Sequence, residues 1–323
     1  SCWGTSWSGS WGAEENRIGG GVPWDSSCAQ AENSWQVQQN SWRGEEWSGG
    51  STAVRKQPPK RAEWTADRSK SMDGGVQDGK RITNIEINKE LVSLSSQVGK
   101  VEPILVLCDE RFGDFNTVNM VTALHRLSKS SDADSRLSVD MRFQRLLAAI
   151  KDPKTLHQFG PREFSNTAWA MVKLDIAETE DILQRLGTIF TRRKLKDLTP
   201  QCTANLAWSF VKADVRDVEG SFCLEKLLCF LGKGVLKQGL DNFKPQEMAN
   251  LAWAYAKAGF YVKNTLVQLI SDEMNRRDLS KFQAQHLSNV AWALGKMETG
   301  NVACGMKQIA SEVVQRGLST FSM

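Results

Sequence analysis

The chain has 323 residues, three His residues and a formal net charge of +4. No apolar run approaches the roughly 18 residues that a membrane-spanning helix needs, and the seven Cys form no CxxC pair, so we expect neither a membrane span nor a zinc site. A Gly-rich phosphate loop, an HExxH motif and a GxSxG motif are also absent, so we expect no enzymatic activity, no cofactor and no small-molecule substrate.

Residues 1–80 differ in composition from the rest of the chain. They contain no Leu and no Phe but hold eight of the twelve Trp, and they carry a net charge of −1 against +5 for residues 81–323. Such a segment cannot bury enough aliphatic surface to offset an ordering entropy of roughly 1–2 kcal/mol per residue. We predict a disordered tail over residues 1–80. Two interpretations of its Trp stay open: contact with a partner, or low-complexity sequence without a selected role.

Residues 81–111 predict helices that cap the N-terminal end of the domain that follows. The periodic stretch Ile82–Leu94 indicates one helix. The apolar stretch Val101–Asp109 is compatible with a strand or a helix, and its all-helical surroundings favour the helix.

Residues 112–323 are dominated by one recurring phrase: Asn, two small or aliphatic residues, Trp, Ala or Ser, two apolar residues and Lys. Four copies begin at Asn166, Asn205, Asn250 and Asn289, and a weaker first copy begins at Asn119, giving Asn-to-Asn steps of 47, 39, 45 and 39 residues. Self-similarity at this period is typical of stacked helical hairpins. The sequence therefore predicts an all-α fold, an α-solenoid of about five repeats opening near residues 112, 159, 198, 243 and 282.

Each repeat is predicted to contain a helix A and a helix B. Helix A follows the opening Phe or Leu, and a Pro two residues later suits its first turn, as at Pro200. Helix B is less uniform, as in Asp181–Phe190. A helix pair cannot cover its own apolar face, so neighbouring repeats must stack. Loop insertions at 216–220 or 232–239 account for the longer steps.

The phrase in its longest form, from Phe243 to Lys257, resembles the octotricopeptide-type repeats of organellar RNA-binding proteins, which are related to the helical repeats of RAP-domain proteins. The resemblance covers about residues 82–323, with Phe115–Leu127 similar to an atypical first repeat. It implies single-stranded RNA binding in a mitochondrion or chloroplast, in RNA stability, processing or translation, beside other organellar RNA-processing proteins. A cytoplasmic location is the alternative. The sequence contains no RAP domain, so no activity of that domain is implied.

On a helical wheel, a polar face of helix A lies opposite its apolar stripe. We predict that one basic residue per repeat follows the phosphate backbone of RNA; these residues are Arg126, Lys173, Lys212, Lys257 and Lys296. The candidates for facing the bases are Asn119, Asn166, Asn205, Asn250, Asn289, Arg162, Gln201, Gln246 and Gln285.

Each of these assignments has a structural alternative. The Asn residues would equally form hydrogen bonds between stacked helices, and a Lys near a helix C-terminus suits the helix dipole. The repeat Trp, embedded among apolar residues, are favoured as packing between repeats over base stacking. At the level of function, the alternative is a protein-binding scaffold on an armadillo- or HEAT-like solenoid, because fold alone does not decide the ligand. One Lys per repeat at a fixed position favours RNA.

Overall fold

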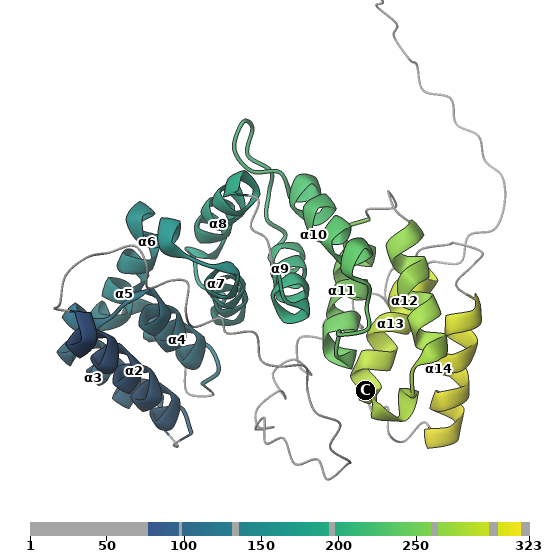
Figure 1. Cartoon of the computed structure of the whole chain (residues 1–323), viewed down its shortest axis with the longest axis horizontal. Helices are drawn as coiled ribbons and strands as arrows, with labels where there is room; N and C mark the ends of the chain where they lie inside the picture. The colour runs from purple at the N-terminus through teal and green to yellow at the C-terminus, as the bar shows by residue number, and fades with distance from the viewer. Residues whose placement is uncertain are drawn as a thin grey trace, which may run out of the picture. The chain divides into compact units, whose positions relative to one another are not determined.

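The computed structural model describes residues 77–96, 99–130, 136–193, 198–259, 264–296 and 303–317, without the side chains of 77–82, 264 and 265. In these segments every regular element is helical, so the predicted all-α class is confirmed (Figure 1). Most of the predicted disordered tail, residues 1–76, lies outside the described residues. The first described helix begins at Gln77.

The helices form two rows that alternate along the chain. The A row contains α2 (Gln77–Leu94), α4 (Thr117–Leu127), α7 (Pro161–Leu174), α9 (Pro200–Lys212), α11 (Pro245–Lys257) and α13 (Ala284–Lys296). The B row contains α3 (Val101–Glu110), α5 (Met141–Lys151) with the short α6 (Pro153–Gln158), α8 (Thr179–Arg193), α10 (Leu224–Gln238), α12 (Asn264–Arg276) and α14 (Ala303–Arg316). We number the hairpins from unit 0 (α2 and α3) to unit 5 (α13 and α14).

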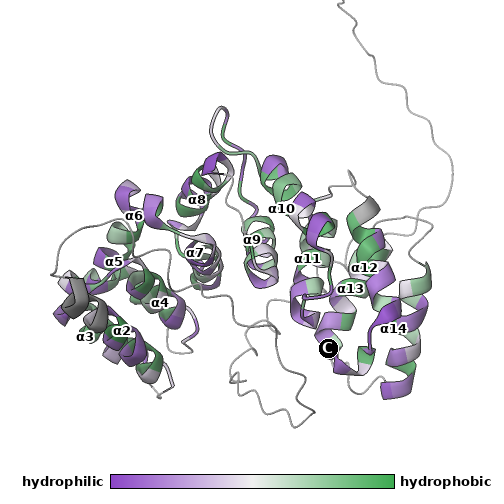
Figure 2. Cartoon of the chain, viewed as in Figure 1, coloured by the Kyte–Doolittle hydropathy of each residue, from purple (hydrophilic) through white to green (hydrophobic). Residues whose placement is uncertain are grey.

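Each A helix packs against the A helices of the neighbouring units, and B helices pack along their own row in the same way. This is the arrangement of an α-solenoid. Hydrophobic residues occupy one side of most helices and hydrophilic residues the other (Figure 2). Part of the core is a series of edge-on aromatic contacts in which the rings of Phe159, Phe164, Phe190 and Phe230 lie 5.6–5.7 Å apart, centroid to centroid.

Two open points of the sequence are decided by the helix bounds. Val101–Glu110 is a helix, as favoured. The extra residues of unit 3 lie in the loop between α9 and α10, which includes Arg216–Gly220, whereas residues 232–238 belong to α10 itself. The insertion therefore lengthens a surface loop and leaves both helices of the unit at ordinary length.

A tight turn opens α4, α7, α11 and α13 and fixes how the repeats align. The N–H of Phe159, Phe243 and Phe282 donates to the carbonyl of the Leu three residues earlier, and the N–H of Phe115 donates to Phe112 in the same way. Phe115 therefore opens unit 1, and the predicted opening at Phe112 is wrong. Phe112 instead replaces the Leu of the other turns.

This alignment moves the first repeat by three residues relative to the sequence prediction. The N-cap residues become Asn116, Gly160, Thr199, Lys244 and Gln283. Counted from the N-cap, the position of the repeat Asn is held in unit 1 by Thr122, that of the repeat Trp by His125, and that of the repeat Lys by Lys129. Asn119 and Arg126 thus have no counterpart in the recurring Asn and Lys of the later units.

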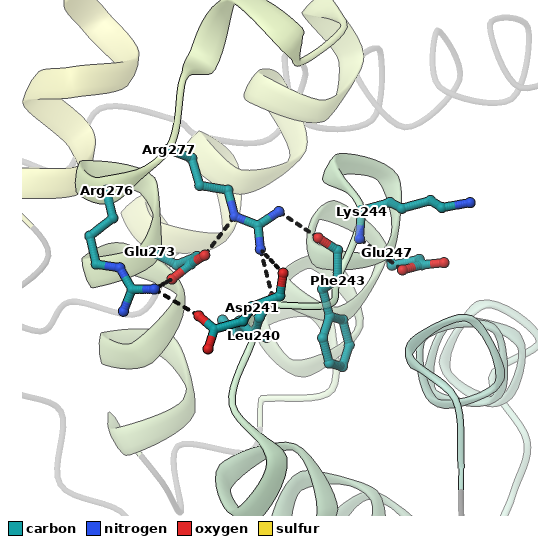
Figure 3. A network of polar contacts seen from close by, with 8 residues as sticks. All are labelled: Leu240, Asp241, Phe243, Lys244, Glu247, Glu273, Arg276 and Arg277. Atoms are coloured by element: carbon teal, nitrogen blue, oxygen red, sulfur yellow. Dashed lines mark hydrogen bonds and ion pairs between the residues drawn. The ribbon is translucent and has the colours of Figure 1, made fainter. Parts of the chain in front are cut away.

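An arginine near the end of the B helix binds this opening turn in units 2, 4 and 5. Arg193, Arg277 and Arg316 each donate to the carbonyl of the Phe 34 residues earlier, at 2.7 Å for Arg193 and 2.6 Å for Arg316. Arg277 and Arg316 also donate to the carbonyl of the Leu in the turn, both at 2.6 Å. Figure 3 shows Arg277 reaching from the end of α12 to the turn before α11. We call this contact the arginine clamp.

The clamp is absent from units 1 and 3 at the equivalent position, five residues before the next opening residue. Lys154 and Gln238 stand there, and both are exposed. In units 4 and 5 the arginine also pairs with a Glu one turn earlier, Glu273 to Arg277 at 2.6 Å and Glu312 to Arg316 at 2.7 Å. The clamp therefore joins the end of a unit's B helix to the turn that opens the A helix of the same unit.

Candidate nucleic-acid interface

In α4, α7, α9, α11 and α13, the first helical turn is stabilised by a side chain at the N-cap or at the third helical residue. These side chains satisfy backbone N–H groups that have no partner within the helix. The contacts are Asn116 N–H to Asn119 (3.2 Å), Gly160 N–H to Glu163 (2.9 Å), Cys202 N–H to Thr199 (3.2 Å), Lys244 N–H to Glu247 (2.8 Å) and Gln283 N–H to His286 Nδ1 (3.3 Å).

Asn119 belongs to this capping set. Its Oδ1 accepts from the Asn116 N–H, its Nδ2 donates to the Asn84 carbonyl of α2 at 2.9 Å, and the residue is 1% exposed. The prediction that Asn119 faces RNA bases is wrong, because both ends of its amide are used inside the fold. The alternative of a hydrogen bond between stacked helices holds for this residue.

Four positions of each A helix form one continuous stripe, which we call the A face. They are the second, sixth, ninth and thirteenth residues, and steps of four, three and four residues return to one side of a helix. In units 2 to 5 the stripe contains Arg162, Asn166, Trp169 and Lys173; Gln201, Asn205, Trp208 and Lys212; Gln246, Asn250, Trp253 and Lys257; and Gln285, Asn289, Trp292 and Lys296. A polar residue, an amide, an indole and an ammonium thus follow one another along each helix.

The polar residues of the A face are accessible to different degrees. Arg162 and Gln201 are exposed, and Gln246 and Gln285 are half-buried. The sixth-position residues Asn166, Asn205 and Asn250 are half-buried as well.

Asn289 differs, since it is 8% exposed and its Oδ1 is buried with no partner in the described part of the chain. Its predicted contact with bases does not fit this burial.

The repeat Trp mainly pack between units. Trp208 is 7% exposed, and Trp169, Trp253 and Trp292 are half-buried against the core. The Trp169 ring lies 5.1 Å from the ring of His125 on the preceding A helix, centroid to centroid. The favoured interpretation, packing between repeats, is therefore consistent with the contacts, and the exposed part of three indoles adds apolar surface to the A face.

Counted from the N-cap, the thirteenth residue in units 1 to 5 is a lysine, and these residues form a lysine row: Lys129, Lys173, Lys212, Lys257 and Lys296. Lys129 lies beyond the end of α4 at Leu127, whereas the other four lie in the last turn of their helices. The ammonium groups of Lys173 and Lys296 lie over the Trp one turn earlier, 5.9 Å and 5.4 Å from the ring centroids. Burial and the charge of Lys212 on the next helix lower the pKa of Lys173. Two adjacent members of the row are therefore close enough to repel each other, as expected where a polyanion lies across several helices.

Arg126, predicted as the first member of the row, is not part of it. It is half-buried one turn before Lys129, and its Nε is buried without a hydrogen-bond partner among the described residues. Burial and the neighbouring Arg162 lower its pKa. Sequence reasoning missed Lys129 because it aligned Asn119 with the repeat Asn, and the Phe112-x-x-Phe115 turn was the signal that would have corrected it.

Comparison with known proteins adds no relative. No family model, no curated protein and no solved structure matches this chain. Across the described residues no helix has the length and apolarity to cross a membrane. The same residues contain no group of three or more His, Cys, Asp or Glu side chains placed to hold a metal ion.

Proposed function

We propose that the array binds single-stranded RNA along its A face. The observation that carries the proposal is the lysine row, with one ammonium at the same helical position in units 2 to 5 and Lys129 just past the end of α4 in unit 1. Each ammonium provides a contact for a backbone phosphate, and release of counterions from the strand favours binding. A protein-binding groove does not need this regularity.

In this proposal, the bases are recognised by the polar side chains at the second and sixth positions of the A helices, which lie nearer the N-terminal ends of the helices than the lysines do. Asn and Gln side chains both donate and accept hydrogen bonds, as the edges of unpaired bases do. Asn166, Asn205 and Asn250, with Arg162 and Gln201 at the second position, are the accessible candidates. Neighbouring packed helices lie about 8–10 Å apart, so each unit offers one such pair to the strand. The resemblance to octotricopeptide repeats supports a role in organellar RNA stability, processing or translation.

The test is binding of the full chain to a randomised single-stranded RNA pool across a salt series. If all five lysines contact phosphates, log affinity against log salt has a slope of about −3.5, at about −0.7 per contact. Lys173→Gln with Lys212→Gln should flatten the slope by about 1.4. Lys233→Gln with Lys237→Gln removes the same charge from exposed positions of α10 and should leave the slope unchanged.

Two results would contradict the proposal. Equal effects of the two double variants would show that the lysine row makes no particular contact with the strand. An absence of binding at low salt would instead favour the scaffold function, to be pursued with peptide ligands.

A further inference from the structure

Unit 2 differs from its neighbours at the two positions of the A helix that are proposed to meet the bases. At the second and sixth positions it has Arg162 and Asn166, whereas units 3 and 4 have Gln and Asn. Unit 1 has the exposed Val118 at the second position, and the sixth-position Asn289 of unit 5 is buried. Units 2 to 4 therefore provide the accessible polar pairs, and Arg162 is the charged residue among them.

Two contacts fix the backbone from which the Arg162 side chain projects. The Glu163 carboxylate accepts the N–H of Gly160 at 2.9 Å and so caps the first turn of α7. The arginine clamp of unit 2 holds the turn before α7, since Arg193 donates to the Phe159 carbonyl at 2.7 Å. Arg162 itself is exposed. An ordered helical turn thus presents a guanidinium to solvent on the A face, as precise recognition requires.

A guanidinium and an amide need different partners on a base. Arg has N–H donors in a fixed fork and no acceptor, so its bidentate contact needs two neighbouring acceptors, whereas the amides of Gln and Asn both donate and accept. Adenine and uracil have no such pair of acceptors. Guanine has O6 and N7, the commonest specific contact of Arg with a base. Cytosine has O2 and N3, but its smaller ring covers less of the half-buried Trp169, which is next along the A face.

We propose that unit 2 recognises a guanine and that Arg162 determines this preference. The Arg162 guanidinium donates to O6 and N7 of the base. Asn166 lies one helical turn away on the same face, and its carbonyl accepts from the guanine N1–H beside O6. Units 3 and 4 discriminate less among bases, so unit 2 sets the register of the strand on the array. The inference rests on the proposed function and adds the base that one unit prefers.

The test measures binding of the full chain to short oligouridylates that carry one substituted base in the middle. The substituted base is guanine, adenine, cytosine, 7-deazaguanine or hypoxanthine. We expect the guanine probe to bind about ten-fold more tightly than the adenine probe, a difference of about 1.4 kcal/mol. The 7-deazaguanine probe should lose this advantage because it has no N7. The hypoxanthine probe should keep it, since hypoxanthine has O6, N7 and N1–H and lacks only the amino group of guanine.

Three variants at exposed positions assign the preference to a residue. Arg162→Gln gives unit 2 the amide of units 3 and 4 and should remove the guanine preference. Gln201→Arg is the reciprocal change, and it should create a preference for adjacent guanines over a single one. Arg192→Gln removes the same charge from an exposed position near the end of α8 and should leave the preference unchanged. Substitutions at such surface positions have little effect on stability, which circular dichroism verifies.

The outcomes separate this inference from the proposed function. A guanine preference that persists in Arg162→Gln overturns the inference and leaves the lysine row in place. Equal weakening of all probes by Arg162→Gln would show that the guanidinium contacts a phosphate, and the inference fails in that case too. Tighter binding of the cytosine probe than of the guanine probe also overturns it. If neither these probes nor the randomised pool binds at low salt, the proposed function itself fails, and the inference with it.

Discussion

The arginine clamp of unit 4 gives the sharpest prediction about stability. Arg277→Met keeps most of the apolar stem and removes the guanidinium that donates to the carbonyls of Phe243, Leu240 and Asp241. It also leaves Glu273, whose side chain is 5% exposed, without its partner at 2.6 Å. We expect the variant to be less stable than wild type.

The contacts set the size of the effect. Breaking a buried ion pair by removing one partner costs about 3–5 kcal/mol. Arg276 also contacts Glu273, at 3.2 Å, and continues to offset its charge. We therefore expect a loss of about 3 kcal/mol, at the lower end of that range. Arg276→Met is the matched control at the neighbouring residue. It removes the pairs with Asp241 and Glu273 but keeps the Arg277–Glu273 pair, and because the Arg276 side chain is 65% exposed, we expect a loss of no more than about 1 kcal/mol.

Urea denaturation followed by circular dichroism measures the difference. Hydrogen exchange of the α11 and α12 amides shows whether the loss is local, since repeat arrays open in parts. Adding Glu273→Leu to Arg277→Met should recover part of the stability by removing the unpaired carboxylate. Equal destabilisation by Arg276→Met and Arg277→Met would refute the clamp as a stabilising contact.

Two further predictions concern single positions. Burial lowers the pKa of His286 from 6.5 to about 4, so the unfolded chain binds more protons between these values and stability falls as pH falls through them. His286→Gln keeps an acceptor for the Gln283 N–H, and urea titrations at pH 7 and pH 5 should show a smaller loss than in wild type, by about 1–2 kcal/mol. A Cβ at Gly187 would lie 2.3 Å from the Phe222 ring, so Gly187→Ala should destabilise by about 1–3 kcal/mol despite the better helix propensity of Ala. Gly234→Ala, which meets nothing within 4 Å in α10, should stabilise by up to about 1 kcal/mol in the same titrations, and the same sign for both variants would contradict the packing argument.

The architecture was predictable because the repeat displays it several times. A solenoid needs the same apolar pattern in every unit, so four near-copies of one phrase were enough to predict stacked hairpins. The first copy was misaligned because Asn119 imitates the repeat Asn in sequence while acting as a helix cap. Hydrogen bonds to Asn116 and Asn84 establish that role. The bond to Asn84 comes from another unit, so a local sequence pattern does not reveal it.

The candidate interface was only partly predictable, for the same reason. Spacing placed Lys173, Lys212, Lys257 and Lys296 on one face, but it did not show how deeply each Asn lies between helices. Asn289 is buried and Asn166 is half-buried, although both occupy the same position in the phrase.

The uneven distribution of the clamp gives the array a varying stiffness. In a clamped unit, the arginine resists separation of the opening turn from the end of the B helix. Unit 3 lacks this contact, because the exposed Gln238 stands in place of the arginine, and it also has the longer loop before α10. Under tension along the row of helices, we expect unit 3 to yield before units 2 and 4 on either side. The distance between Lys173 and Lys257 should then change most easily to match the spacing of phosphates along a bound RNA strand.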